Sequence, residues 1–324
     1  MTLMNGIWRK VHNIYKKRLR FHFFQPRTAL ILIICPLSLF ACTYIETLQK
    51  PFFSYFSKPG PKKIEIKPYT ISGQNIIDDA LLASIVYETD DMIQSFCAEN
   101  GYKKVNIGLV NEYEVKFFTA HKNGFQYIVV RGTSNYANVQ SDIIASPVYD
   151  ALSNIWLHKG FRDAAIAVFD HLQQSYPKIN PKKKTIIIGH SLGGAIANIL
   201  GIYLSKNDCC LDRIITFGQP KITNEKGLSS YSHLQLIRVV GEGDVIANVP
   251  PKTDFFTYTH GGFKISINDT SMEYATLGDP FNNKDDDPVD LQMNLARLSH
   301  AANHKISNYI QRLEKHKNKI ISVQ

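Results

Sequence analysis

Residues 185–200, TIIIGHSLGGAIANIL, contain a serine whose surroundings suit it to act as a nucleophile. The isoleucine run is typical of a buried parallel strand, and the small and apolar residues after Ser191 recur at helical spacing. Gly189 and Gly193 flank Ser191 two residues before and after it. A serine on so sharp a strand-to-helix turn needs such neighbours without a Cβ, because the backbone there is strained. The helix N-terminus would then direct its amides at charge developing near Ser191 Oγ, so the spacing predicts a nucleophile. A tightly packed turn without chemistry is the alternative.

A serine hydroxyl at neutral pH needs a base, and that base needs a carboxylate to orient it. In α/β-hydrolases, which carry their serine on a turn that this one resembles, the acid and then the histidine follow along the chain. Glu242 and Asp244 both qualify as the acid, because both follow directly after a predicted strand. The histidines downstream of the serine are His233, His260, His300, His304 and His316. Spacing alone does not choose between His300 and His304.

Predicted strands and helices alternate along the chain, which favours a mostly parallel sheet with helices on both faces. We expect helices at 75–87, 92–97 and 159–176, and a largely helical segment at 291–315. We expect strands at 105–110, 114–120, 125–130, 186–188, 213–217 and 234–240, and edge strands at 255–258 and 263–267. Asn123-Gly124 predicts a hairpin turn. Sites in such sheets lie at the carboxyl ends of strands, and Thr133, Ser191 and Asp244 all follow predicted strands.

The composition is that of a chain with a large core, since 44% of its 324 residues are hydrophobic. One α/β domain with an N-terminal extension fits this length. The formal net charge of +9 is concentrated in residues 1–42, which carry seven basic side chains and no acidic one. The remaining residues have a net charge of +2. This nearly neutral body gives no electrostatic reason to expect a nucleic-acid partner.

The N-terminal segment is typical of an export signal. Residues 29–41, ALILIICPLSLFA, form an apolar run of signal-peptide length that is too short to span a membrane comfortably. The run ends at Leu39-Phe40-Ala41-Cys42, which resembles a bacterial lipoprotein signal with Cys42 as the lipidated residue. An uncleaved anchor or a plain secretory signal are the alternatives, and all three predict export. We therefore expect a leader at 1–41, a proline-containing tether at 42–70 and the folded domain at 71–324.

Several blocks of residues, in order, resemble the class 3 (fungal-type) lipase family of α/β-hydrolases over most of residues 75–310. GHSLGGA at 189–195 is the first of them. The others are Val129–Thr133, Leu157–Phe161, Ile215–Pro220, Arg238–Pro251, Tyr258–Gly262 and His304–Ile310. In the family, the loop after the block that corresponds to Val129–Thr133 includes the lid. Residues 134–141 are polar here, which favours a soluble or micellar ester over strong activation at an oil–water interface.

The resemblance implies an α/β-hydrolase fold and a Ser191-Asp244-His304 catalytic triad. It thereby selects one acid and one histidine from the candidates above. It also implies an oxyanion hole made by the backbone amides of Thr133 and Leu192.

The implied activity is that of a carboxylic ester hydrolase, a lipase or esterase, acting on lipid or acyl-ester substrates. It needs neither a metal nor an organic cofactor. A lipid anchor or uncleaved leader would add a membrane surface as a partner. Acyl transfer, phospholipase activity with the same triad, and a non-catalytic lipoprotein scaffold are the alternatives.

Overall fold

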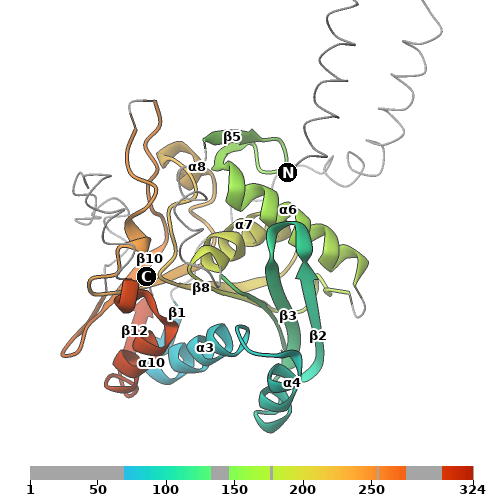
Figure 1. Cartoon of the computed structure of the whole chain (residues 1–324), viewed down its shortest axis with the longest axis vertical. Coiled ribbons are helices and arrows are strands. Elements are labelled where there is room, and N and C mark those ends of the chain that lie inside the picture. The colour runs from blue at the N-terminus through green and yellow to red at the C-terminus, as the bar shows by residue number, and fades with distance from the viewer. Residues whose placement is uncertain (1–68, 133–145, 176–177, 254, 275–300, 324) are drawn as a thin grey trace, which may run out of the picture. The chain divides into compact units, whose positions relative to one another are not determined.

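The computed structural model of the chain describes residues 69–132, 146–175, 178–253, 255–274 and 301–323 (Figure 1). The predicted leader, Cys42, Thr133 and the polar loop 134–141 lie outside these residues. The first described element is a strand that begins at Tyr69. Within the described ranges, no helix combines the length and apolar character needed to cross a bilayer.

An eight-stranded sheet forms the centre of the described structure, in the order β11-β10-β9-β8-β7-β4-β3-β2. The strands from β10 to β4 in this order run parallel, whereas β3, β2 and β11 pair antiparallel with their neighbours. The strands are β2 (Lys103–Val110), β3 (Val115–Lys122), β4 (Phe125–Val130), β7 (Thr185–His190), β8 (Leu211–Phe217), β9 (Leu236–Gly241), β10 (Phe263–Ile267) and β11 (Met272–Tyr274). The predicted mostly parallel sheet is confirmed.

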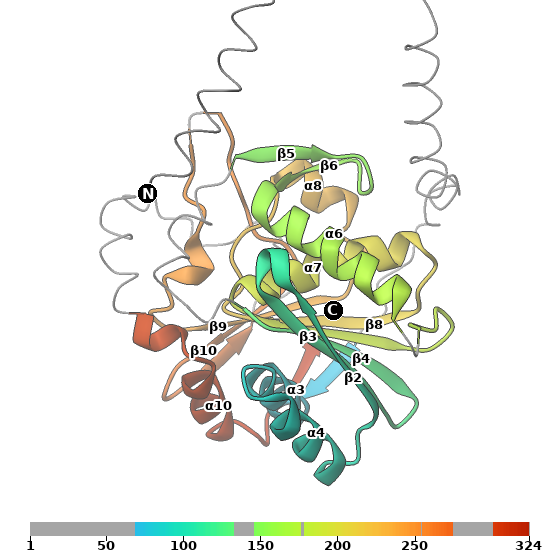
Figure 2. The same cartoon turned by 45° about the vertical axis from the view of Figure 1, so that its right-hand side comes forward.

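Helices cover both faces of this sheet (Figure 2). They are α6 (Lys159–Gln174) and α7 (Leu192–Lys206) on one face, and α3 (Gly73–Ile85), α4 (Asp90–Glu99) and α10 (Ile306–Glu314) on the other. Successive residues of β7 divide between the two cores. Ile187 packs with α6 and α7, whereas Ile186 and Ile188 pack with the helices of the opposite face. Because strand side chains alternate between faces, a strand covered on both sides must be apolar throughout, which explains the isoleucine run.

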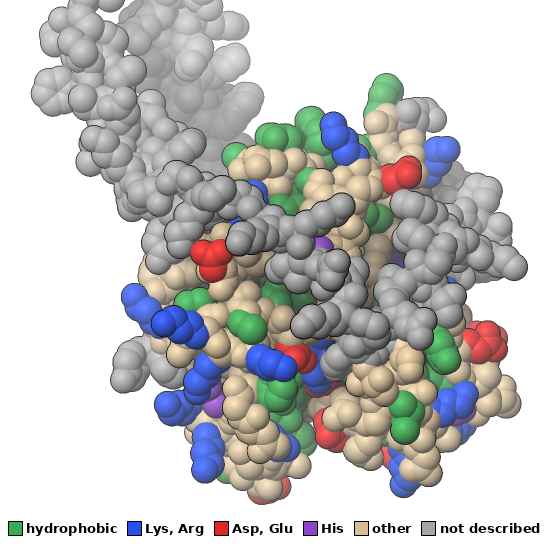
Figure 3. Space-filling view, turned by 180° about the vertical axis from the view of Figure 1, so that it is seen from behind, with side chains coloured by type: hydrophobic (Ala, Val, Ile, Leu, Met, Phe, Trp, Pro, Cys, Tyr) green, Lys and Arg blue, Asp and Glu red, His purple; other side chains and the backbone are tan. Residues whose placement is uncertain are grey.

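Smaller elements complete the described structure. Two antiparallel pairs lie apart from the central sheet, β1 with β12 and β5 with β6. The elements are β1 (Tyr69–Ser72), β12 (Ile320–Val323), β5 (Pro147–Asp150), β6 (Ile155–His158), α8 (Glu225–Ser230) and the 3-10 turns η1 (Asn111–Tyr113), η2 (Ile246–Asn248) and η3 (Ala301–His304). The β1–β12 pair joins the two ends of the described chain. On the face in Figure 3, basic and acidic side chains are both spread over the described surface.

The predicted hairpin between β3 and β4 is confirmed. Asn123 and Gly124 have φ angles of 51° and 84°, and Lys122 pairs with Phe125 across the turn. Positive φ at both central residues is the geometry for which an Asn-Gly pair is suited.

The two predictions of edge strands are wrong, the first entirely and the second in part. Residues 255–258 do not form a strand, because Thr253 closes a turn by bonding the backbone of Phe256 and leaves Phe255 98% exposed. The strand at 263–267 exists, but β10 lies between β9 and β11 and is not an edge strand. The described part of 291–315 is largely helical, as expected, with the extended backbone of Lys305 separating η3 from α10.

A buried ion pair ties α3 to the sheet. Arg213 on β8 donates from Nη2 and Nε to Asp79 Oδ2 at 2.7 and 3.1 Å, and both side chains are buried. Burial raises the pKa of Asp79 to about 6, and the Arg213 charge offsets part of that rise. Removing one partner of such a pair leaves the other charge buried without compensation.

Replacing Arg213 with Met should therefore lower the free energy of unfolding by about 3–5 kcal/mol. The double variant Asp79→Leu, Arg213→Met should recover most of this loss, because neither charge is then buried. Urea denaturation at neutral pH measures both. A double variant as unstable as Arg213→Met would contradict the explanation by desolvation.

Candidate active site

Ser191 lies on the turn between β7 and α7 with φ 60° and ψ −134°. This conformation is strained for a residue with a side chain. The turn is too tight for side chains beside it, since a Cβ on Gly189 would collide with the Gly193 carbonyl oxygen. A Cβ on Gly193 would lie 2.6 Å from the carbonyl carbon of Arg131. The Ser191 amide donates to Phe217 O at 2.9 Å, which joins the turn to the end of β8. The predicted strand-to-helix turn is present.

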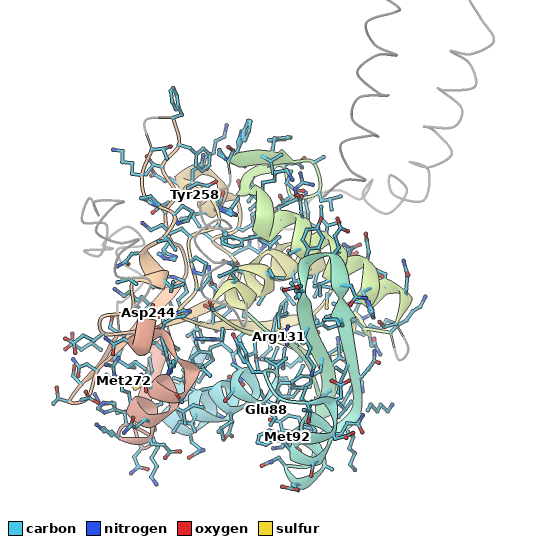
Figure 4. The ribbon with its side chains drawn as sticks, viewed as in Figure 1. Glu88, Met92, Arg131, Asp244, Tyr258 and Met272 are labelled. Carbon is cyan, nitrogen blue, oxygen red and sulfur yellow. The ribbon has the colours of Figure 1, made fainter. Side chains whose placement is uncertain are left out.

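His304 and Asp244 form a hydrogen-bonded pair in the interior. His304 Nδ1 lies 2.7 Å from Asp244 Oδ2, and both side chains have no exposed area. Asp244, labelled in Figure 4, follows β9, and its Oδ1 accepts the Ile246 amide at 2.9 Å. His304 is the last residue of η3. Lys305, which has an extended backbone, separates η3 from α10.

Ser191 and His304 both adjoin the end of β8. A Cβ on Gly218, directly after β8, would lie 2.6 Å from Asp244 Oδ2 and 2.7 Å from His304 Cε1. The ring of His190, the residue before Ser191, stacks on the His304 ring with centroids 4.8 Å apart. The fold therefore joins His304 to Asp244 and places this pair next to His190, which directly precedes Ser191, and next to Gly218 at the end of β8.

The other sequence candidates have different surroundings. Glu242 is exposed, and its backbone carbonyl accepts a bond from an arginine on α10. The Nε2 atoms of His260 and His316 donate to backbone carbonyl oxygens, at 2.5 and 3.4 Å. His233 is half-buried before β9, and His300 lies outside the described residues.

Of the two predicted oxyanion donors, Leu192 lies within the described residues and Thr133 lies outside them. Leu192 is the first residue of α7, and the first amides of a helix have no acceptor within it. Thr133 lies outside the described residues, but Gly132 before it packs against the serine. A Cβ on Gly132 would lie 2.8 Å from Ser191 Cβ.

Residues 127–254 match the sequence model of the family described as lipase (class 3). This match covers 128 of the 324 residues, and it shows that this part of the chain is similar to class 3 lipases. A lipase from Rhizomucor miehei is 32% identical over 158 residues, which cover 45% of this chain and 43% of that protein. The secreted mono- and diacylglycerol lipase 1 of Fusarium solani is 28% identical over 174 residues, with 51% and 48% covered. The match thus spans less than half the length of these relatives.

A solved triacylglycerol lipase with a serine protease triad at its catalytic centre has a structure similar to that of this chain. The TM-score is 0.51 at 22% identity, covering 71% of this chain and 96% of that chain. This likeness shows a shared α/β-hydrolase fold. The family match ends at residue 254, so His304 is placed beside Asp244 by the geometry and not by that match.

Tyr309 is a part of the site that the sequence reasoning did not single out. It is fully buried on α10, donates its hydroxyl to Asp244 Oδ2, and accepts the Gly241 amide at 3.0 Å. Its position in the block that begins with His304 is the one feature of the sequence that points to a role in the site. Its contact with Asp244 depends on how α10 packs against the sheet.

The hydrogen bonds around Asp244 favour its ionised form. Burial would raise the pKa of Asp244, but His304, by charge and hydrogen bond, and the bonds from Tyr309 and Ile246 hold it below its ordinary value. Burial raises the pKa of Tyr309, so its hydroxyl stays protonated and donates. Burial, together with the His304 charge, lowers the pKa of His190 to about 3, so that ring is neutral.

Replacing Tyr309 with Phe should lower the free energy of unfolding by about 1.5–3 kcal/mol near neutral pH, because the hydroxyl bonds a carboxylate. The depressed pKa of Asp244 contributes stability that is complete above its unfolded pKa of about 3.9 and is lost as the pH falls through the folded pKa. The difference between wild type and variant should therefore shrink below about pH 4. Urea denaturation over a pH series measures it. A loss that stays constant over the series would contradict the role assigned to Tyr309.

Proposed function

We propose that this protein is a serine-dependent carboxylic ester hydrolase acting on lipid or acyl esters. The observation that carries the proposal is the fully buried bond between His304 Nδ1 and Asp244 Oδ2, beside a serine on a strained turn. The match of residues 127–254 to the class 3 lipase model supports it, as does a relative from Ricinus communis named a triacylglycerol lipase, 25% identical over 210 residues.

In the acylation step, Ser191 Oγ attacks the ester carbonyl carbon while its proton passes to His304 Nε2. Asp244 accepts the bond from His304 Nδ1–H, which fixes the tautomer and stabilises the imidazolium that forms. The depressed pKa of Asp244 keeps its carboxylate charged for this task. The tetrahedral intermediate then collapses, and His304 gives the proton to the departing alcohol.

Deacylation repeats the sequence with water. His304 takes a proton from water as the oxygen attacks the acyl-enzyme carbonyl, and the carboxylic acid leaves as Ser191 regains its proton. The negative oxygen of each intermediate would be held by the backbone amides of Leu192 and Thr133. One such donor lowers the barrier by roughly 3–4 kcal/mol.

Wild-type protein should hydrolyse p-nitrophenyl esters, and Ser191→Ala should lose this activity by about a millionfold in kcat, to background. A series of acyl chain lengths would give the preferred substrate length. The matched control is Ser205→Ala, since Ser205 lies at the other end of α7 and its hydroxyl donates to Ile202 O within the same helix. Activity that survives Ser191→Ala, or none on any ester, would overturn the proposal.

We propose further that the chain is exported through its N-terminal segment, with a leader at 1–41, a tether at 42–70 and the catalytic domain at 71–324. The basic region followed by an apolar run supports export, and the Fusarium solani relative is named as secreted. Lipidation of Cys42 after cleavage would hold the catalytic domain at a bacterial membrane surface.

Replacing Cys42 with Ser should abolish palmitate labelling and release the protein from the membrane fraction, because the lipid is attached through the thiol. Cys35→Ser, in the apolar run, is the matched control and should leave labelling unchanged. The experiment uses the full chain expressed in bacteria. Labelling of the Cys42 variant at the wild-type level would exclude the lipoprotein assignment.

A further inference from the structure

Three hydrogen bonds that the mechanism above does not use connect separate parts of the site. The Gly132 amide donates to the Tyr87 hydroxyl at 3.1 Å. That hydroxyl lies 2.8 Å from His190 Nδ1, and His190 Nε2 lies 2.8 Å from the backbone oxygen of His304. The series therefore runs from the end of β4, through the residue before Ser191, to the segment that carries His304.

The chemistry of the partners fixes the direction of each bond. The His304 carbonyl oxygen can only accept, so His190 Nε2 carries the proton. In a neutral imidazole Nδ1 is then an acceptor, and the Tyr87 hydroxyl donates to it. The Tyr87 oxygen is left to accept the Gly132 amide. His190 is 1% exposed and its pKa is lowered to about 3, so its ring stays neutral and this arrangement persists.

Close packing accompanies these bonds. A Cβ on Gly132 would lie 2.6 Å from the Tyr87 hydroxyl and 2.7 Å from the His190 backbone oxygen. It would also lie 2.8 Å from Ser191 Cβ. The residues after β4 thus pack directly against the serine turn and against Tyr87. Tyr87 lies in the turn between α3 and α4. A displacement of Tyr87 would therefore shift Gly132 and, through it, the backbone turn that carries Ser191.

A histidine at position 190 makes contacts that an apolar residue there could not make. An apolar side chain would fill the interior without the cost of burying an imidazole. The imidazole instead bonds a hydroxyl with one nitrogen and a backbone carbonyl with the other, while its face stacks on His304. Such a side chain sets the distance between the segments that it joins.

We propose that Tyr87 and His190 are positioning residues for ester hydrolysis, which hold the end of β4, the Ser191 turn and the His304 backbone in fixed relation. The inference rests on the proposed function of the Ser191 site. Its physical basis is that reacting groups displaced by about 1 Å can lose on the order of a hundredfold in rate. Because the proposed role is to position the reacting groups, the effect should fall on kcat and leave KM nearly unchanged.

The first test is Tyr87→Phe in the full chain, assayed on a p-nitrophenyl ester that the wild type hydrolyses. Rates are divided by the concentration of sites titrated with a fluorophosphonate, so that unfolded protein does not count. We expect kcat per titrated site to fall by about 10–100-fold, with KM within about twofold. Tyr127→Phe is the matched control, because Tyr127 lies near the start of β4 and pairs with the start of β7. Equal kcat values for the two variants would overturn the inference.

The second test separates positioning from packing at residue 190. His190→Phe keeps a ring of similar size but loses both bonds, whereas His190→Gln retains a donor that can face the His304 carbonyl. We expect the Gln variant to exceed the Phe variant by about tenfold in kcat per titrated site. Equal rates would show that the bonds do not position the site. If the wild type is active and these variants match it, only this inference fails, whereas an inactive wild type overturns the proposed function as well.

Discussion

The buried hydrogen bond between His304 and Asp244 joins two ionisable side chains that are 60 residues apart in the chain. Burying a carboxylate is costly unless several donors replace the water that it loses. Here the donors are His304, Tyr309 and the Ile246 amide, which come from η3, α10 and η2. The loop after β9 and the packing of α10 on the sheet are therefore constrained by one carboxylate. A shift of either element would leave a buried charge without a partner.

The strained backbone of Ser191 is held by the sheet and by the helix that follows it. A positive φ at a non-glycine residue costs roughly 1–3 kcal/mol and persists only where its surroundings enforce it. β7 lies between β4 and β8 in the sheet, and α7 is buried along most of its length. Neither element can move to relax the turn at Ser191. The catalytic geometry that we propose is thus set by a rigid strand and helix, with the histidine supplied by a segment that Asp244 fixes in place.

Local signals in the sequence were sufficient for the serine turn, the β3–β4 hairpin and the parallel sheet. Each of these depends on residues that are close in the chain, such as Asn123-Gly124. The partners of Ser191 depend on contacts between distant segments, so spacing left Glu242 beside Asp244 as an open choice. The contact of Tyr309 with Asp244 and the β1–β12 pair were missed for the same reason. The aromatic residues of 255–258 favour a strand, but Thr253 bonds the backbone of Phe256 and closes a turn there.

The most direct measurement is the site of covalent labelling by a fluorophosphonate, mapped by mass spectrometry of peptides from the full chain. A serine activated by the His304–Asp244 pair should form one adduct, on the peptide that contains Ser191, and at a rate that falls by orders of magnitude when His304 is replaced by Ala. An adduct on a different residue, or ester hydrolysis by a protein that Ser191 labelling does not inhibit, would contradict the assignment of this serine as the nucleophile.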